Sequence, residues 1–152
     1  MRKKKTVFVY TDGSCSGNPG PGGWCAMLKY KGNEKIISGG EDYTTNNRME
    51  LAGVVNALRA LKEPCEVIVT CDSRYVVDAI IKGWLVDWKA RGWRKSNKKP
   101  TQNVDLWEQM LVELKKHDVF FNWIRGHAGH PENEYCDKIA VRESLSRKEK
   151  NS

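Results

Sequence analysis

The chain has 152 residues, of which 39% are hydrophobic and 30% charged, and its formal net charge at pH 7 is +7. These values are typical of one soluble globular domain. No apolar run approaches the roughly 20 residues of a membrane span, and the short apolar stretch after MRKKK is too brief for a signal peptide. The five cysteines are odd in number and lack C-x-x-C spacing, so neither a disulfide framework nor a zinc site is indicated. Reduced thiols in a cytoplasmic protein are the simplest interpretation.

The positive charge is concentrated in two segments. Residues 82–99 contain seven lysines and arginines against one aspartate, and residues 2–5 form a second basic run. We expect a single domain over residues 1–152, with a basic tail at 1–5, a basic segment at 82–99 and a polar, fraying tail at 147–152. A basic patch on a nearly balanced body favours a polyanionic partner, although lysine runs are often only solvated surface.

Three strands are predicted in the first third of the chain. TVFVYT at 6–11 is rich in β-forming residues, and the runs at 24–30 and 34–39 flank a Lys31-Gly32-Asn33 turn as a hairpin. Between them, SGNPGPGG at 16–23 has Gly and Pro at turn positions, which predicts a loop. This loop contains neither G-x-G-x-x-G nor G-K-[ST], so a nucleotide-binding loop is not indicated.

Helices and strands alternate in the remainder. Apolar residues from Leu51 to Leu61 recur with helical spacing and predict a helix that ends near Pro64, after polar capping positions at 43–47. A short buried strand at 66–71 precedes a helix that Ser73 can cap. After the basic segment we predict a helix at 104–116, a strand at 119–124 and a final helix at 132–146.

This succession predicts an α/β fold of order βββαβαβα, with an extra helix beside the basic segment. We expect a five-stranded mixed sheet, with three antiparallel strands followed by two parallel ones and helices on both faces. Because crossover connections make strands parallel, the ends of the strands at 6–11 and 66–71 meet at one end of the sheet if the two are neighbours.

Four carboxylates stand in motifs at the ends of these elements. They are Asp12 in TDGSCSGNPGPGG, Glu50 in TTNNRMEL, Asp72 in VTCDSRYV and Asp137 in GHAGHPENEYCDKIA. Taken singly, each could be a turn former or an ordinary residue of a helix terminus. Brought together by the fold, they form a cluster of negative charge of the kind that a hard divalent ion such as Mg²⁺ requires. Two such ions can activate a water and stabilise the leaving oxygen of a phosphodiester.

Together these motifs resemble the ribonuclease HI family over residues 6–142, in family order and at family spacing, and the GW-WK-RGW run belongs to the same pattern. The resemblance implies an RNase H-like fold and endonucleolytic hydrolysis of the RNA strand of an RNA/DNA hybrid, which leaves 5′-phosphate and 3′-hydroxyl ends. It implies two Mg²⁺ ions per active site, with Mn²⁺ possible, held by Asp12, Glu50, Asp72 and Asp137. His127 resembles the mobile histidine that aids proton transfer or product release.

The resemblance also implies substrate contacts. The minor-groove contacts to the RNA strand correspond to the Cys15 backbone and to Asn18, Asn46 and Asn47, whose amides can both donate to and accept from a 2′-hydroxyl. Thr45 and Asn103 correspond to a pocket for a DNA-strand phosphate, and Arg48 is a nearby candidate. One residue of the TTNN run is expected to cap the helix as well.

The segment at 82–99 resembles the basic protrusion of the family, which we expect to supply affinity and not chemistry. Its predicted contacts are Lys95, Lys98, Lys99 and Trp84, and Trp107 is predicted to lie near the DNA strand as well. Trp88 and Trp93 could instead pack a small core of the protrusion itself. Of the other histidines, His130 is expected to brace its loop and His117 to lie on the surface.

Three alternatives remain at this stage. A non-catalytic hybrid-binding module would need the basic protrusion but not the carboxylates. Another nuclease of the superfamily, such as a resolvase or a transposase-like core, would share the carboxylates but not the protrusion. A domain from a reverse transcriptase is the third, and the initial methionine and short tail favour a stand-alone enzyme. We expect a monomer with no obligate protein partner.

Overall fold

The computed structural model describes residues 4–126 and 129–150. In chain order its elements are β1 (Lys5–Cys15), β2 (Gly20–Tyr30), β3 (Asn33–Thr44), α1 (Asn46–Arg59), β4 (Cys65–Cys71), α2 (Arg74–Ile81), α3 (Trp84–Ala90), α4 (Val104–Lys116), β5 (Asp118–Trp123) and α5 (Pro131–Lys150). The predicted succession is confirmed, and the extra helices are α3, which lies within the basic segment, and α4, which follows it.

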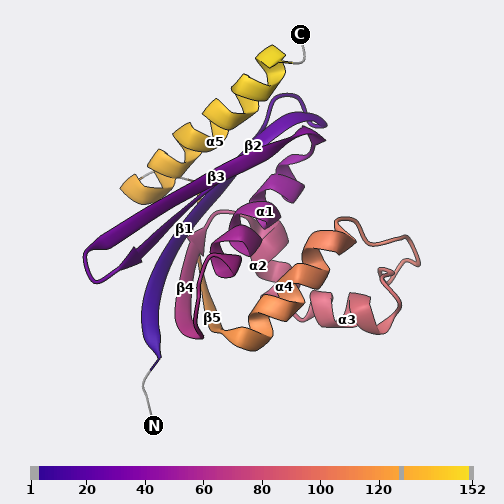
Figure 1. The fold of residues 1–152 in the computed structure, drawn as a ribbon. Helices are drawn as coiled ribbons and strands as arrows, with labels where there is room; N and C mark the ends of the chain where they lie inside the picture. Colours follow the sequence, from indigo (N-terminus) through magenta and orange to yellow (C-terminus); the bar gives the residue numbers. More distant parts are fainter. Residues whose placement is uncertain (1–3, 127–128, 151–152) are drawn as a thin grey trace.

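The five strands form one mixed sheet in the order β3-β2-β1-β4-β5. β2 pairs antiparallel with β1 and with β3, whereas β4 pairs parallel with β1 and with β5. α5 packs across β1, β2 and β3 on one face, and α1 packs on the other face with α2 and α4 beside it (Figure 1). The predicted α/β fold with helices on both faces is therefore confirmed, and β1 and β4 are neighbours whose carboxyl ends meet.

The main core lies between the sheet and α1. Leu51, Val55 and Leu58 of α1 are fully buried and belong to the same cluster as Val9 of β1 and Val69 of β4, which pair in register. Burial of each such side chain contributes about 1.5–3 kcal/mol. This layer fixes the first turns of α1 over the carboxyl ends of the two central strands.

The first two strands are longer than predicted. β1 continues through Gly13 to Cys15 and β2 begins at Gly20, so the predicted loop shortens to residues 16–19. Asp12-Gly13 is therefore not a turn, because Gly13 pairs with Trp24 inside the sheet. A Cβ on Gly13 would lie 2.5 Å from the backbone nitrogen of Glu50. Glycine at this position lets α1 approach the strand closely, as glycine within a strand often does for a neighbouring backbone.

Two predictions about the second half of the chain are corrected. His117, predicted on the surface, has a side chain only 2% exposed. Its Nδ1 accepts a hydrogen bond from the Cys65 N–H at 3.1 Å, because the chain turns from α4 into β5 directly beside the start of β4. α5 remains helical to Lys150 and does not end near Ser146. The hydroxyl of Ser144 donates to the Pro21 carbonyl at 2.9 Å, which continues the packing of this helix along the sheet.

The basic segment at 82–99, called the protrusion from here on, consists of α3 and the loop that follows, and it projects from the body beyond α4 (Figure 1). Trp88 packs on Trp107 with ring centroids 5.8 Å apart, and Trp93 Nε1 donates to Glu108 at 2.9 Å. Both tryptophans join the main core and anchor the protrusion to α4, so the predicted small separate core is not formed. Within the described residues, no helix is long and apolar enough to cross a membrane.

Candidate active site

Three of the four predicted carboxylates meet at the carboxyl ends of β1 and β4. Asp12 lies in β1 and is only 2% exposed, Asp72 follows the last residue of β4, and Glu50 lies in the second turn of α1. One oxygen from each of the three lies within 4.8 Å of the other two. The parallel pairing of β1 with β4 brings Asp12 and Asp72 together, as predicted.

α1 delivers Glu50 to this cluster with its geometry fixed at two points. The Thr45 hydroxyl caps the helix and accepts from the Arg48 N–H at 3.2 Å, which confirms the predicted cap in the TTNN run. The Gly13 N–H donates to Glu50 Oε1 at 3.1 Å. The carboxylate is therefore tied to the backbone of the strand that carries Asp12.

The cluster is electrostatically unfavourable in the absence of cations. Burial raises the pKa of Glu50 well above its ordinary value, and the negative charges of Asp12 and Asp72 raise it further, against the opposing effect of the Gly13 N–H. Burial also raises the pKa of the Cys71 thiol behind the cluster to about 12, so this thiol stays neutral at physiological pH. Glu50 therefore favours its protonated form until positive charge enters the site.

The residues present fit a divalent metal ion. The cluster offers only carboxylate oxygens, which are the ligands that Mg²⁺ and similar hard cations prefer. Glu50 Oε2 is buried and has no hydrogen-bond partner among the described residues. An oxygen in that state is costly to bury, and coordination of a cation would satisfy it.

A groove of about 600 Å³ opens over the cluster. Three other predicted contact residues line it, namely Cys15, Asn46 and Asn47. Four further residues of the lining were not predicted as contacts, namely Ser14, Ser73, Arg74 and Tyr75. The signal that could have identified Arg74 and Tyr75 is their place directly after Asp72 and Ser73 at the start of α2.

The wall of the groove formed by α2 is held by aromatic side chains. Trp123 Nε1 donates to the Asp72 carbonyl at 3.0 Å, and the Arg74 guanidinium lies 4.0 Å from the centroid of the Trp123 ring. The Tyr75 hydroxyl accepts from Asn103 Nδ2 at 3.0 Å and from Trp107 Nε1 at 2.9 Å. Asp72 thus stands on a backbone that is braced from β5 as well as from α2.

Asp137 lies on α5, outside the group of three carboxylates. One turn earlier, Asn133 Nδ2 donates to the carbonyls of Thr11 and Thr70 at 3.3 and 3.0 Å. Residues four apart lie on the same face of a helix. Asp137 is therefore on the same face of α5 as Asn133, which meets the ends of β1 and β4. His127 lies outside the described residues.

The predicted contacts on the far side of the groove form a network. Asn18 Oδ1 accepts from the Asn46 N–H at 3.2 Å. The Arg48 guanidinium pairs with Glu41 at 2.9 Å and with Asp105 at 2.7 Å, and it donates to Asn103 Oδ1 at 3.4 Å. These bonds place Arg48 as a residue that ties α1 to β3 and α4, and its contact with substrate stays a prediction.

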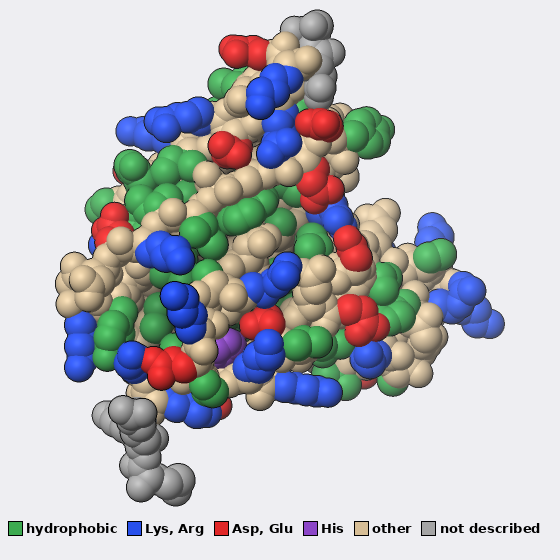
Figure 2. Space-filling view, viewed as in Figure 1, with side chains coloured by type: hydrophobic (Ala, Val, Ile, Leu, Met, Phe, Trp, Pro, Cys, Tyr) green, Lys and Arg blue, Asp and Glu red, His purple; other side chains and the backbone are tan. Residues whose placement is uncertain are grey.

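The predicted aromatic and basic contacts in the protrusion and on α4 separate into two groups. Trp84 is 42% exposed and lies with Lys95 in the lining of a depression of about 320 Å³. Lys98 and Lys99 are exposed as well, and Lys and Arg side chains gather on this part of the surface (Figure 2). Trp107 is fully buried, so its predicted position beside the DNA strand is wrong. Its ring is a core residue against which Tyr75 and Trp88 pack.

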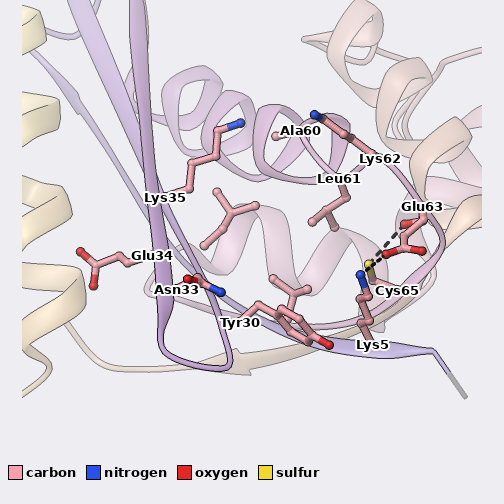
Figure 3. A pocket seen from close by; sticks show the side chains of 12 residues that line it. Lys5, Tyr30, Asn33, Glu34, Lys35, Ala60, Leu61, Lys62, Glu63 and Cys65 are labelled. Atoms are coloured by element: carbon pink, nitrogen blue, oxygen red, sulfur yellow. Dashed lines mark hydrogen bonds and ion pairs between the residues drawn. The ribbon is translucent and has the colours of Figure 1, made fainter.

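A second cavity, of about 270 Å³, lies at the opposite ends of β1 and α1 (Figure 3). Apolar side chains, including those of Val7, Leu28 and Leu61, line it, and Lys5 pairs with Glu63 at 2.6 Å along its edge. None of the carboxylates of the cluster takes part in it. Of these two cavities, the groove over Asp12, Glu50 and Asp72 is the one in which three carboxylates converge.

Comparison with known proteins gives concordant results. The family model described as RNase H matches residues 4–145. A ribonuclease H of Thermus thermophilus is 52% identical over 143 residues, which cover 94% of this chain and 86% of the relative. A ribonuclease HI of Brucella melitensis is 56% identical over 136 residues, which cover 90% of this chain and 88% of the relative.

Solved structures agree with these relatives. The crystal structure of LC9-RNase H1, described as a type 1 RNase H with the type 2 active-site motif, has a TM-score of 0.84 and 36% identity, and the match covers 97% of this chain and 75% of that one. LC11-RNase H1, solved in complex with an RNA/DNA hybrid, has a TM-score of 0.68 at 22% identity, with 92% and 97% covered. The second likeness bears on the fold alone.

Proposed function

The chain belongs to the RNase H family and is a ribonuclease H, and we propose that its groove cleaves the RNA strand of an RNA/DNA hybrid with the help of two divalent cations. The products are a 5′-phosphate and a 3′-hydroxyl. The observation that carries the proposal is the meeting of Asp12, Glu50 and Asp72 within 4.8 Å in an open groove. A protein that only binds hybrids would gain nothing from three carboxylates whose mutual repulsion destabilises the fold.

Asp12, Glu50 and Asp72 would hold the cations, and Asp137 is proposed as a fourth ligand from its place on α5. Bound in this way, two divalent cations supply a water of lowered pKa and stabilise the leaving 3′-oxygen. The protein positions the charge for them: β1 and β4 fix Asp12 and Asp72, and the Gly13 N–H orients Glu50. Mg²⁺ is the proposed ion, with Mn²⁺ as a substitute.

Selectivity for RNA is proposed to come from the lining of the same groove. The Cys15 backbone and the exposed amides of Asn46 and Asn47 lie beside the carboxylates, and the side-chain oxygen of Asn18 supports the backbone of Asn46. Amide groups both donate and accept, which matches a 2′-hydroxyl. A deoxyribose at the same position leaves these groups without their partner, so DNA should bind less well.

The complementary strand is proposed to lie across Thr45 and Asn103 toward the protrusion. Asn103 directly precedes α4 and is held by Tyr75 and Arg48, so its position is fixed before substrate arrives. In the protrusion, cations meet phosphates and the exposed ring of Trp84 offers a flat surface to a sugar. The lysines concerned are Lys95, Lys98 and Lys99.

The remaining proposals concern His127, the location of the protein and its oligomeric state. His127 is proposed to aid proton transfer or product release. The cytoplasm is the proposed location, which the five free cysteines support, because reduced thiols are usual in that compartment. A monomer without an obligate partner is proposed because the proposed ligands and contacts all come from one chain.

The test is a substrate panel. The protein is incubated with the same end-labelled RNA alone, paired with DNA or paired with RNA, and with the matching DNA duplex, in Mg²⁺ or in EDTA. Metal-dependent cleavage of the RNA in the hybrid alone, with 3′-hydroxyl products, is the expected result. Binding of the hybrid without cleavage under either Mg²⁺ or Mn²⁺ would replace this proposal with the binding-module alternative.

A further inference from the structure

Arg74 has a distinct place in the groove. It is the first residue of α2, two positions after Asp72, and its side chain is exposed. Among the described residues that line the groove, three are acidic and Arg74 is the one cation. An arginine remains protonated at any physiological pH, so this positive charge is present whether or not metal ions are bound.

The guanidinium of Arg74 packs on a ring of the neighbouring strand. Its central carbon lies 4.0 Å from the centroid of the Trp123 ring, which is within the range of a cation–π interaction. The ring itself is fixed, because Trp123 Nε1 donates to the Asp72 carbonyl at 3.0 Å. A contact with the ring face uses none of the N–H donors of the guanidinium, which can therefore bind a planar or tetrahedral oxyanion.

The surrounding charge makes such a cation useful. Three carboxylates within 4.8 Å of one another repel a phosphodiester as long as no divalent cation is bound. A guanidinium on the same wall attracts a backbone phosphate and positions the strand. A cation in this position could bind a phosphate without the help of metal ions.

We propose that Arg74, packed over the Trp123 ring, binds a backbone phosphate of the nucleic acid in the groove. The proposal rests on the proposed function only for the identity of the polymer. Trp123 acts through Arg74 and through the Asp72 backbone, so it is a positioning residue. Because the contact is to a phosphate, it contributes equally to binding of a hybrid and of a DNA duplex.

The experiment measures binding in EDTA, where no divalent cation takes part. Fluorescence anisotropy of a labelled hybrid and a labelled DNA duplex is recorded at several salt concentrations for the wild type, Arg74→Ala and Arg74→Lys. The matched control is Arg59→Ala, which also removes one exposed arginine. Arg59 is the last residue of α1, at the end of the helix away from Glu50, and it donates to Gln109. Thermal melting of each variant confirms that it is folded.

For Arg74→Ala we expect about tenfold weaker binding of both duplexes, the size of one charge-assisted hydrogen bond. The slope of log K against log salt falls by about 1, as for the loss of one phosphate contact. Arg74→Lys retains the slope and recovers part of the affinity. In the cleavage assay, Arg74→Ala raises KM and leaves kcat nearly unchanged, because the contact is made equally in the ground state and the transition state.

Two results would overturn the proposal. The first is a change for Arg74→Ala no larger than that for Arg59→Ala. The second is a loss confined to the hybrid with an unchanged salt slope, which would identify a 2′-hydroxyl contact instead. A wild-type protein that cleaves nothing would defeat the proposed function, and the binding measurements in EDTA would still decide the role of Arg74.

Discussion

Asp12→Asn should stabilise the metal-free protein while abolishing cleavage. Asparagine retains the shape of the aspartate and one acceptor oxygen, but it removes a negative charge that is only 2% exposed and lies among two others. A buried carboxylate that lowers the stability of the fold gives no structural benefit, so its presence indicates a functional role. Opposite effects on stability and on activity from a single isosteric change therefore separate a functional carboxylate from a structural one.

The size of the effect follows from the geometry. Two unit charges no more than 4.8 Å apart repel each other by at least about 3.5 kcal/mol at an effective dielectric constant near 20. Glu50 relieves part of this repulsion by taking up a proton, because its pKa is raised, and water in the groove screens another part. We therefore expect Asp12→Asn to raise the free energy of unfolding by about 1–3 kcal/mol, or the Tm by about 2–10 °C.

The assay is thermal melting at pH 8 in EDTA and again in Mg²⁺. The wild type should gain stability from Mg²⁺ and Asp12→Asn should gain less, because one proposed ligand is lost. The matched control is Asp118→Asn, which removes an exposed carboxylate paired with Lys4 at 2.9 Å and should not raise the Tm. A lower Tm for Asp12→Asn than for the wild type in EDTA would refute the electrostatic argument.

Three further predictions concern other parts of the molecule. Neutralising Lys95, Lys98 and Lys99 should raise KM and flatten its salt dependence while kcat holds, and an unchanged KM at low salt would contradict this. Burial lowers the pKa of His117 from 6.5, so its contribution to stability is complete above pH 6.5 and is lost as the pH falls toward the folded-state pKa. His117→Asn should therefore show a flatter loss of Tm between pH 6.5 and 5 than the wild type. Arg48→Ala should lower the free energy of unfolding by about 1–2 kcal/mol in urea titrations, since both of its ion pairs are partly solvated. Arg48→Lys should recover little of this, because an ammonium group cannot form the paired hydrogen bonds of a guanidinium.

The carboxylate cluster could be predicted from the sequence because each member sits at the end of a regular element. Alternating and helical patterns locate β1, α1 and β4, and the parallel crossover brings the ends of β1 and β4 together. Asp12, Glu50 and Asp72 then meet without any knowledge of side-chain geometry. The same reasoning could not define the extent of β1, because the role of Gly13 depends on how closely α1 approaches it.

Side-chain direction was the part that the sequence left open. The family resemblance predicted Trp107 beside the DNA strand, yet its side chain points into the core, where the indole N–H donates to the Tyr75 hydroxyl. His117 closes a helix among charged residues and is buried by the turn into β5. Arg48 forms ion pairs with Glu41 of β3 and Asp105 of α4 that were not predicted. These partners become neighbours only in the folded chain, so the periodicity of the sequence cannot predict them.

The most direct test of the central claim compares cleavage of the same end-labelled hybrid by the wild type, Asp12→Asn, Glu50→Gln and Asp72→Asn in Mg²⁺. Circular dichroism and hybrid binding serve as controls for folding and substrate capture. If the three carboxylates form one metal-dependent active site, each substitution reduces the cleavage rate by at least about a hundredfold while the hybrid is still bound. Cleavage at near wild-type rates by any two of the three variants would contradict the account and would require the chemistry to lie elsewhere on the molecule.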